Sequence, residues 1–461
     1  MPEITAPAPT MAEGWRSGTG FLLATIGSAV GIGSIWKFPY EVGANGGGAF
    51  VLVYLAGLAL VVVPLMVAEF AIGRRGRGDA ASSLGVVAAQ AGRSPRWTWI
   101  GLLGAATAFV ILSFYAVIGG WTIHYTVTTA AQGLPGASAA DAQGTFDELL
   151  ADPARMAAFL LLFLATVAGI VLRGVQQGIE RAMKVLMPLL AVLLVALAVY
   201  SMAAGDASAA LRFLFVPDFG QLTGRAVLDA LGLGFFSIGV GLGLLITYAA
   251  YSPPDVALRR AAVVSVGADT AISIIAGLAV FPVVFANGLD PAEGPGLVFV
   301  SLPVAFAAVP GGRFAAVAFF ALLLIAALGS AVSMLEGVVA VADRRLGWPR
   351  PRSTAVAAGA CFVVGLGTVW SFNRWAGVHP LGFLDRYRNA TVFDLLDEAT
   401  SNLMLPLGGL GLAVLCGWVL PARFLGDQLA VAGWQLRGLR FLLRVAAPVS
   451  IVAASVAALT S

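Results

Sequence analysis

The sequence predicts an all-α membrane protein with about 11 transmembrane helices, arranged as two inverted five-helix repeats in which helices one and six are broken. The first observation is composition: 59% of the 461 residues are hydrophobic and 11% are charged, which no soluble core explains. The second is that long apolar stretches recur along the whole chain, separated by glycine, proline and charged residues. The third is that two of these stretches, five spans apart, are interrupted by glycines.

Eleven stretches have the length of about 20 residues or more that a helix needs to cross a bilayer. They cover residues 17–44, 47–73, 97–128, 154–173, 181–204, 226–250, 257–287, 312–343, 353–372, 391–420 and 437–458. The segment 294–310 is apolar but short and interrupted by prolines, so we expect a re-entrant or capping hairpin there. The chain then divides into an N-terminal tail (1–14), a first repeat (15–204), a second, inverted repeat (205–420) and an additional span (421–461).

The distribution of lysine and arginine predicts the orientation of these spans. With a cytoplasmic N-terminus, 19 of the 27 basic residues face the cytoplasm and 8 lie elsewhere. The C-terminus of an eleven-span chain then faces outward. The N-terminal tail lacks the basic and then apolar layout of a cleaved signal, so we expect the first apolar segment to stay in the protein.

The first span contains the stretch Gly27-Ser-Ala-Val-Gly-Ile-Gly-Ser-Ile-Trp-Lys-Phe-Pro-Tyr40. Its three glycines and Pro39 weaken a helix, and Lys37 places a cation among apolar residues. Broken backbone at membrane depth survives only where protein, water, ions or a substrate satisfies its polar groups. The stretch is therefore a candidate binding site.

The sixth span repeats this interruption, with five glycines between Gly232 and Gly243. Two glycine-broken helices at corresponding positions of two halves are typical of an inverted-repeat secondary transporter with a site near the bilayer midplane. The alternative is that these glycines only permit close helix packing, which is common in membranes. The paired positions and the cation Lys37 favour transport.

Asp269 lies deep in the seventh span, where an unpaired carboxylate is costly and suggests a function. Its alternative role is to pair with Arg259 or Arg260, which lie two to three turns away. Other classes of function find little support. No basic run with interleaved aromatics indicates nucleic-acid binding, and no nucleophile–base pair, metal cluster or phosphate loop indicates an enzyme.

The broken first span also resembles a known family. Together with Asn45-Gly-Gly-Gly-Ala-Phe50 and Pro64-Leu-Met-Val-Ala-Glu-Phe-Ala-Ile-Gly-Arg74, it is similar to the opening of the neurotransmitter:sodium symporters, and the bacterial branch is the closer match. The similarity continues in Phe213-Leu-Phe-Val-Pro-Asp218, Ile246-Thr-Tyr-Ala-Ala-Tyr251, Ala276-Gly-Leu-Ala-Val-Phe-Pro282 and Asn402-Leu-Met-Leu-Pro-Leu-Gly-Gly409. The resemblance implies sodium-coupled symport of an amino acid into the cell, by alternating access, across a bacterial inner membrane.

The resemblance also implies a substrate pocket. Family members with glycine at the position of Gly31 bind amino acids, whereas monoamine carriers have an aspartate there. The substrate carboxylate would then meet the amides near Gly31 and Gly33 and the hydroxyl of Tyr115, while Ser28 and span-one carbonyls would take the ammonium. Gly239 leaves room for a large hydrophobic or aromatic substrate side chain. The implied substrate-binding residues are Ser28, Ala29, Gly31, Gly33, Ile111, Tyr115, Phe236, Ser237, Gly239, Leu242, Ser330 and Met334.

Sodium is the implied coupling ion, with one or two ions bound. The first site would use Ala29, Ser34, Ser237 and Asp269, and the second Gly27, Val30, Ala326 and Ser330. Ser34 replaces the family's usual asparagine, and Gly329 replaces a ligand with a side-chain oxygen, so either site could be weakened. As a fixed negative charge, Asp269 would remove the need for chloride, and it could also carry a proton outward on the return step.

Two gates are implied as well. Lys37 and Asp397 align with the outer gate pair, which would close above the substrate beside Tyr115 and Phe236. On the inner side the usual arginine before Trp15 is absent, and we expect Arg16 and Asp343 to replace that pair. The alternative function is a membrane sensor that binds an amino acid without transporting it. The sequence leaves open the identity of the amino acid, the sodium stoichiometry and the oligomeric state.

Overall fold

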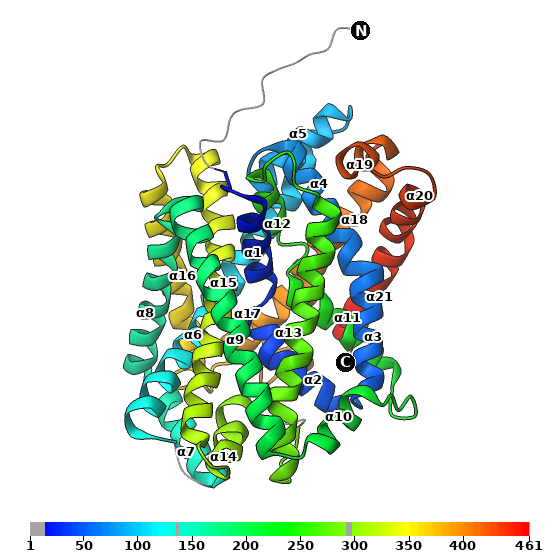
Figure 1. Ribbon diagram of the computed structural model, residues 1–461. Helices are drawn as coiled ribbons and strands as arrows, with labels where there is room; N and C mark the ends of the chain where they lie inside the picture. Colours follow the sequence, from blue (N-terminus) through cyan, green and yellow to red (C-terminus); the bar gives the residue numbers. More distant parts are fainter. Residues whose placement is uncertain (1–13, 135–137, 292–296, 461) are drawn as a thin grey trace.

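The computed structural model describes residues 14–134, 138–291 and 297–460, and every regular element in these residues is a helix. The helices form one tall bundle, with α5 (Ala80–Gln90) and α19 (Ala422–Leu429) at one end and α7 (Ala139–Ala151), α10 (Ala207–Phe215) and α14 (Leu302–Ala307) at the other (Figure 1). Apart from Gly14, the predicted N-terminal tail lies outside the described residues.

Nine helices of the described residues are long and apolar enough to cross a bilayer, and one bent pair forms a tenth span. The nine are α3 (Gly48–Gly57), η2 (Leu58–Val62) and α4 (Val63–Gly76); η3 (Pro95–Trp97) and α6 (Thr98–Gln132); α8 (Pro153–Val171); η4 (Val175–Glu180) and α9 (Arg181–Ala204); α13 (Leu258–Ala286); α15 (Gly312–Leu346); α16 (Arg350–Ser371); α17 (Val392–Glu398), η7 (Ala399–Met404), α18 (Leu405–Val414) and η8 (Leu415–Val419); and α20 (Gly433–Phe441), η9 (Leu442–Ala446) and α21 (Ala447–Thr460). Each predicted span therefore contains helix, and the broken sixth span supplies the remaining one.

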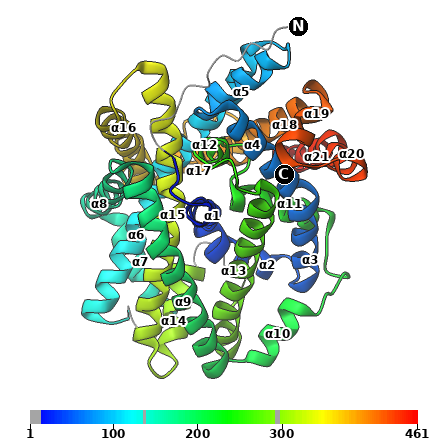
Figure 2. The ribbon, with the colours of Figure 1, turned by 45° about the horizontal axis from the view of Figure 1, so that its top comes forward.

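The tenth span is the broken first helix. It consists of α1 (Gly18–Ala29), a π-helical turn η1 (Gly33–Lys37) and α2 (Phe38–Ala44), with a bend of 53° between its two halves. The Ser17 side chain caps α1 by accepting a hydrogen bond from the Gly20 amide at 3.0 Å. Figure 2 shows α1 in the middle of the bundle, where it packs against α9, α13 and α15. The break thus lies at the centre of the protein.

The sixth span is broken in the same way, between α11 (Gly224–Ile238) and α12 (Leu244–Ala250). Gly241 in this break has φ +95°, a conformation that L side chains rarely adopt. A Cβ atom there would also lie 2.7 Å from the Gly409 amide nitrogen on α18. Both the backbone angle and the close approach of α18 therefore require glycine at this position.

Short helices add to the predicted spans. The sequence did not predict α5, α7, α10 and α19, which are too short to cross a bilayer and cover the ends of the bundle (Figure 1). The predicted hairpin 294–310 contains η5 (Leu297–Ser301) followed by α14, while its first three residues lie outside the described part of the chain. The core is built around α6 and α15, which are each 35 residues long and pack along each other.

Candidate functional site

A cavity of about 50 Å³ lies where the breaks in the first and sixth spans face α6 and α15. The structure places eleven of the twelve predicted substrate residues around it: Ser28, Gly31, Gly33, Ile111, Tyr115, Phe236, Ser237, Gly239, Leu242, Ser330 and Met334. Ala29, the twelfth, is buried and does not line the cavity. Three further residues, Ile32, Leu244 and Leu405, line it without having been predicted. Residues far apart in the chain thus meet at one buried point.

The polar side of this cavity is built around Tyr115. Its hydroxyl accepts a hydrogen bond from the Ile32 amide at 3.2 Å, so it satisfies one of the donors that the break in α1 exposes. A Cβ atom on Gly31 would lie 2.5 Å from Ser330 Oγ and 3.2 Å from the Tyr115 hydroxyl. No side chain fits at Gly31 without displacing them. The cavity therefore contains hydroxyls and amides but has no carboxylate among its lining residues.

Next to the cavity, a fully buried carboxylate gathers three hydroxyls. Ser34 Oγ lies 2.5 Å from Asp269 Oδ1, and Ser237 Oγ lies 3.1 Å from Asp269 Oδ2. The Tyr54 hydroxyl donates to Asp269 Oδ2 at 3.3 Å. Three of the four residues predicted for the first sodium site, Ser34 on η1, Ser237 on α11 and Asp269 on α13, therefore meet here, and Tyr54 on α3 joins them. Oxygens of this kind are the hard ligands that an alkali cation prefers.

The alternative role of Asp269, pairing with an arginine, is not what the structure shows. Hydroxyl groups are its hydrogen-bond partners, whereas Arg259 lies on the exposed end of α13 and donates to Gln435 Oε1 at 3.5 Å. Because the carboxylate is buried in the bundle interior, it belongs to the broken-helix region rather than to the exposed start of α13.

The predicted second sodium residues meet where α1 contacts α15. Ser330 Oγ donates to the carbonyls of Ser28 at 3.3 Å and Val30 at 3.4 Å. Ala326 is buried one turn earlier on α15. A Cβ atom on Gly329 would lie 2.6 Å from the Gly27 carbonyl oxygen, which itself is a predicted ligand. The absence of a side chain at Gly329 thus allows this carbonyl to lie directly against α15.

A second cavity, of about 120 Å³, has Lys37, Glu41 and Asp229 among its lining residues; it is called the outer cavity here because it lies on the side predicted to face outward. Phe236 and Leu405 line both cavities and therefore separate them. The Lys37 ammonium lies over the Phe236 ring, 4.7 Å from its centroid.

The predicted outer gate pair is not closed in this structure. Within the described residues the ion pairs do not join Lys37 to Asp397, whose carboxylate instead accepts a hydrogen bond from Ser401 Oγ at 3.2 Å. Lys37 faces the open outer cavity and the aromatic ring beneath it. A gating role for the pair stays a prediction.

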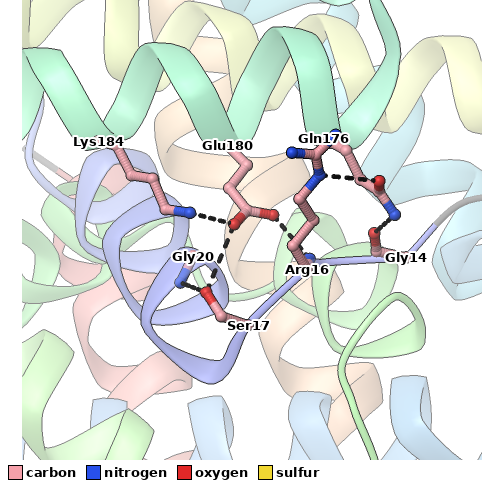
Figure 3. A network of polar contacts seen from close by, with 7 residues as sticks. All are labelled: Gly14, Arg16, Ser17, Gly20, Gln176, Glu180 and Lys184. Atoms are coloured by element: carbon pink, nitrogen blue, oxygen red, sulfur yellow. Dashed lines mark hydrogen bonds and ion pairs between the residues drawn. The ribbon is translucent and has the colours of Figure 1, made fainter.

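At the predicted inner gate the structure corrects the expected pairing of Arg16. Its side chain donates to Gln176 Oε1 at 3.2 Å, and its backbone amide donates to Glu180 Oε2 at 2.8 Å (Figure 3). The prediction that Asp343 is the partner of Arg16 is therefore wrong. The physical reason is that η4, at the start of the fifth span, lies beside the chain that precedes α1.

Glu69 is a site residue that sequence reasoning missed. It is fully buried in α4 and accepts a hydrogen bond from the Gly241 amide at 2.6 Å, inside the break of the sixth span. The signal was present, because a carboxylic acid in the middle of an apolar span is rare without a function. Its role here is to satisfy a backbone donor that the break leaves without a helical partner.

Comparison with known proteins explains why these groups come together. Residues 12–148 and 145–404 match the model of the Sodium:neurotransmitter symporter family. The chain belongs to this family. An uncharacterized sodium-dependent transporter of Bacillus subtilis, YhdH, is 38% identical to this chain over 398 residues, which cover 86% of this chain and 85% of that protein. An uncharacterized sodium-dependent transporter of Haemophilus influenzae is 32% identical over 413 residues, covering 88% of this chain and 89% of that protein.

The fold of the chain is also similar to a solved structure. The crystal structure of MhsT in complex with L-phenylalanine superposes with a TM-score of 0.88 at 40% identity, covering 97% of this chain and all of that one. This match confirms the all-helical symporter fold and the family resemblance that the motifs of the first span had indicated. Transport coupled to sodium is thus the activity of the family to which the chain belongs.

Proposed function

We propose that this protein is a sodium-coupled symporter that carries an amino acid, with a hydrophobic or aromatic side chain, into the cell by alternating access. The main support is the cavity at the broken first span, whose lining residues offer amide and hydroxyl groups but no carboxylate. Such a site suits a substrate that brings its own carboxylate. The solved relative MhsT, with bound L-phenylalanine, supports this substrate class.

The substrate's two ends would meet different surfaces of the cavity. Its carboxylate would lie near the Tyr115 hydroxyl and the amides of the α1 break, while Ser28 and nearby carbonyls would accept from the ammonium. Its side chain would lie among the apolar lining residues Ile111, Leu242 and Met334. These side chains contribute apolar area and shape, so they favour a hydrophobic side chain over a charged one.

We assign one sodium ion to Asp269, Ser34 and Ser237. The Ala29 carbonyl would be a further ligand, as the family resemblance implies. The carboxylate would neutralise the ion inside a low-dielectric site, so transport would not need chloride. A second ion would use the carbonyls of Gly27, Val30 and Ala326 with Ser330 Oγ. Because Gly329 has no side-chain oxygen, this second site would be the weaker one.

In the transport cycle, sodium would first order the broken segment, and the substrate carboxylate would complete the ion's ligands. Phe236 and Lys37 would then close the path to the outer cavity, with Asp397 as the partner of Lys37. Release of the weaker sodium ion would permit the inner half to open. Each step requires only that ligands bind the two conformations with different affinities.

We also propose that this multi-pass protein lies in a bacterial inner membrane. The N-terminus would be cytoplasmic and the C-terminus outside, because this orientation places most lysines and arginines in the cytoplasm.

The test is uptake of a panel of labelled amino acids into proteoliposomes, driven by a sodium gradient, with gluconate replacing chloride. We expect sodium-dependent, chloride-independent uptake of a hydrophobic or aromatic amino acid. Asp269→Asn should lower the apparent sodium affinity by at least about 100-fold, because the ion loses its only buried anionic ligand in the cluster. The matched control, Asp218→Asn, alters an exposed turn and should have no effect.

Four results would contradict parts of this proposal. Uptake at the same rate with and without a sodium gradient would exclude sodium-coupled symport. Chloride dependence, or an unchanged sodium affinity in Asp269→Asn, would remove the fixed-charge role. Binding of an amino acid without uptake would favour the sensor, for which the missing oxygen at Gly329 is the specific observation.

A further inference from the structure

A buried carboxylate holds the chain that enters the broken first helix. Glu180 is 1% exposed and stands at the end of η4, facing residues 14–20 (Figure 3). Its Oε2 accepts the Arg16 amide at 2.8 Å, and its Oε1 lies 3.5 Å from Ser17 Oγ. Lys184, one turn further along the fifth span, donates to Oε1 at 2.6 Å and is 43% exposed. The carboxylate therefore joins the start of α1 to the fifth span.

The position of Glu180 suits a negative charge. Ser17 is the N-cap of α1, so the carboxylate lies at the positive end of that helix, where it accepts a hydrogen bond from the amide of Arg16, the residue just before the cap. The contact between α1 and Glu180 also requires glycine at position 20. A Cβ atom on Gly20 would collide with the carboxylate of Glu180, so the helix and the acid approach each other only because this residue is glycine.

The same short segment is held from the other repeat. Trp15 is 4% exposed; its amide donates to the Tyr251 carbonyl at 3.1 Å, and its ring nitrogen donates to the Tyr248 carbonyl at 2.9 Å. Gln176 donates to the Gly14 carbonyl at 2.7 Å. Residues 14–17 thus bridge the fifth and sixth spans on the cytoplasmic side, and Glu180 supplies the charged contact of that bridge.

We propose that Glu180 is a positioning residue that holds the inner pathway closed by fixing residues 14–17 against the fifth span. This inference rests on the proposed alternating-access symport, in which the inner half of α1 must move away for release. Movement of α1 leaves the Glu180 carboxylate without its Arg16 and Ser17 donors. The contact therefore favours the inward-closed conformation, and its loss shifts the equilibrium toward the inward-open one.

Hydrogen–deuterium exchange of the peptide containing residues 14–22, in the full-length protein in nanodiscs, tests this role. In the unaltered protein we expect slow exchange in sodium and faster exchange in potassium. Glu180→Gln keeps the side chain's size but removes its charge, and should speed exchange in sodium about tenfold. The apparent sodium affinity should fall by up to the same factor, because sodium must then also restore the closed state.

Two further variants separate positioning from general stability. Lys184→Gln removes the exposed partner that does not touch residues 14–17, and should leave exchange of the peptide unchanged. Gly20→Ala adds a methyl group on α1 that pushes the Glu180 carboxylate away from residues 14–17. This variant should therefore speed exchange of the peptide as Glu180→Gln does. This variant also keeps the test valid if Glu180→Gln does not fold.

The outcomes distinguish failure of this role from failure of transport itself. Sodium-dependent uptake together with unchanged exchange in Glu180→Gln and Gly20→Ala would overturn the role of Glu180 and leave symport intact. Faster exchange throughout the protein, with an unchanged sodium affinity, would also overturn it, because Glu180 would then contribute only to the overall stability of the fold. Absence of sodium-dependent uptake in the unaltered protein would instead overturn the proposed function.

Discussion

A methyl group at position 31 should weaken the binding of both sodium and substrate. In Gly31→Ala the new Cβ atom would lie 2.5 Å from Ser330 Oγ, whereas ordinary contact begins at 3.4 Å. Ser330 Oγ must therefore move by about 0.9 Å, the difference between those two distances, if the backbone stays in place. That movement takes the hydroxyl away from the carbonyls of Ser28 and Val30, of which Val30 shares the proposed second sodium site with Ser330.

The expected size of the effect follows from the group that is lost. A hydrogen-bonding or ligand oxygen facing a charge contributes about 1.5–3 kcal/mol, so sodium affinity should fall by about 10- to 150-fold. Substrate affinity should fall as well, because the methyl group also comes within 3.2 Å of the Tyr115 hydroxyl. Sodium and substrate titrations by isothermal calorimetry on purified protein measure both quantities.

The matched control is Gly267→Ala on α13, where an added Cβ atom meets nothing within 4 Å. This change should leave both affinities unaltered and raise helix stability by up to about 1 kcal/mol. Unchanged sodium and substrate affinities in Gly31→Ala would refute the reasoning. That result would mean that α1 and α15 separate freely and that Ser330 is not held where sodium binds.

Two other changes test single contacts of the site. Tyr115→Phe removes the acceptor of the Ile32 amide and a donor for the substrate, so the KM for uptake should rise about tenfold while the maximal rate changes less; an unchanged KM would contradict the assigned role. Glu69→Ala leaves the buried Gly241 amide without its acceptor and should lower the free energy of unfolding by about 1–3 kcal/mol, seen as a lower Tm. Glu69→Gln keeps an acceptor oxygen and should retain most of that stability; equal Tm values for the two variants would argue against the contact.

Local chemistry in the sequence was sufficient to predict the spans and the two breaks. A bilayer demands long apolar helices, and glycines at corresponding positions mark where the helices are interrupted. The same reasoning singled out Asp269, because a carboxylate at membrane depth needs partners. The residues placed around the cavity were predicted through the family's motifs, since no periodicity relates Ile111 on α6 to Met334 on α15.

Only the tertiary structure decided which groups touch. Arg16 lies beside Gln176 and Glu180 rather than Asp343, since the fifth span packs next to the start of α1. From the sequence, Gly329 appeared only as the loss of a sodium ligand. In the fold, its lack of a side chain allows the Gly27 carbonyl to lie against α15. Spacing along a chain determines which face of a helix a residue occupies, whereas the partner across that face depends on how helices distant in sequence pack.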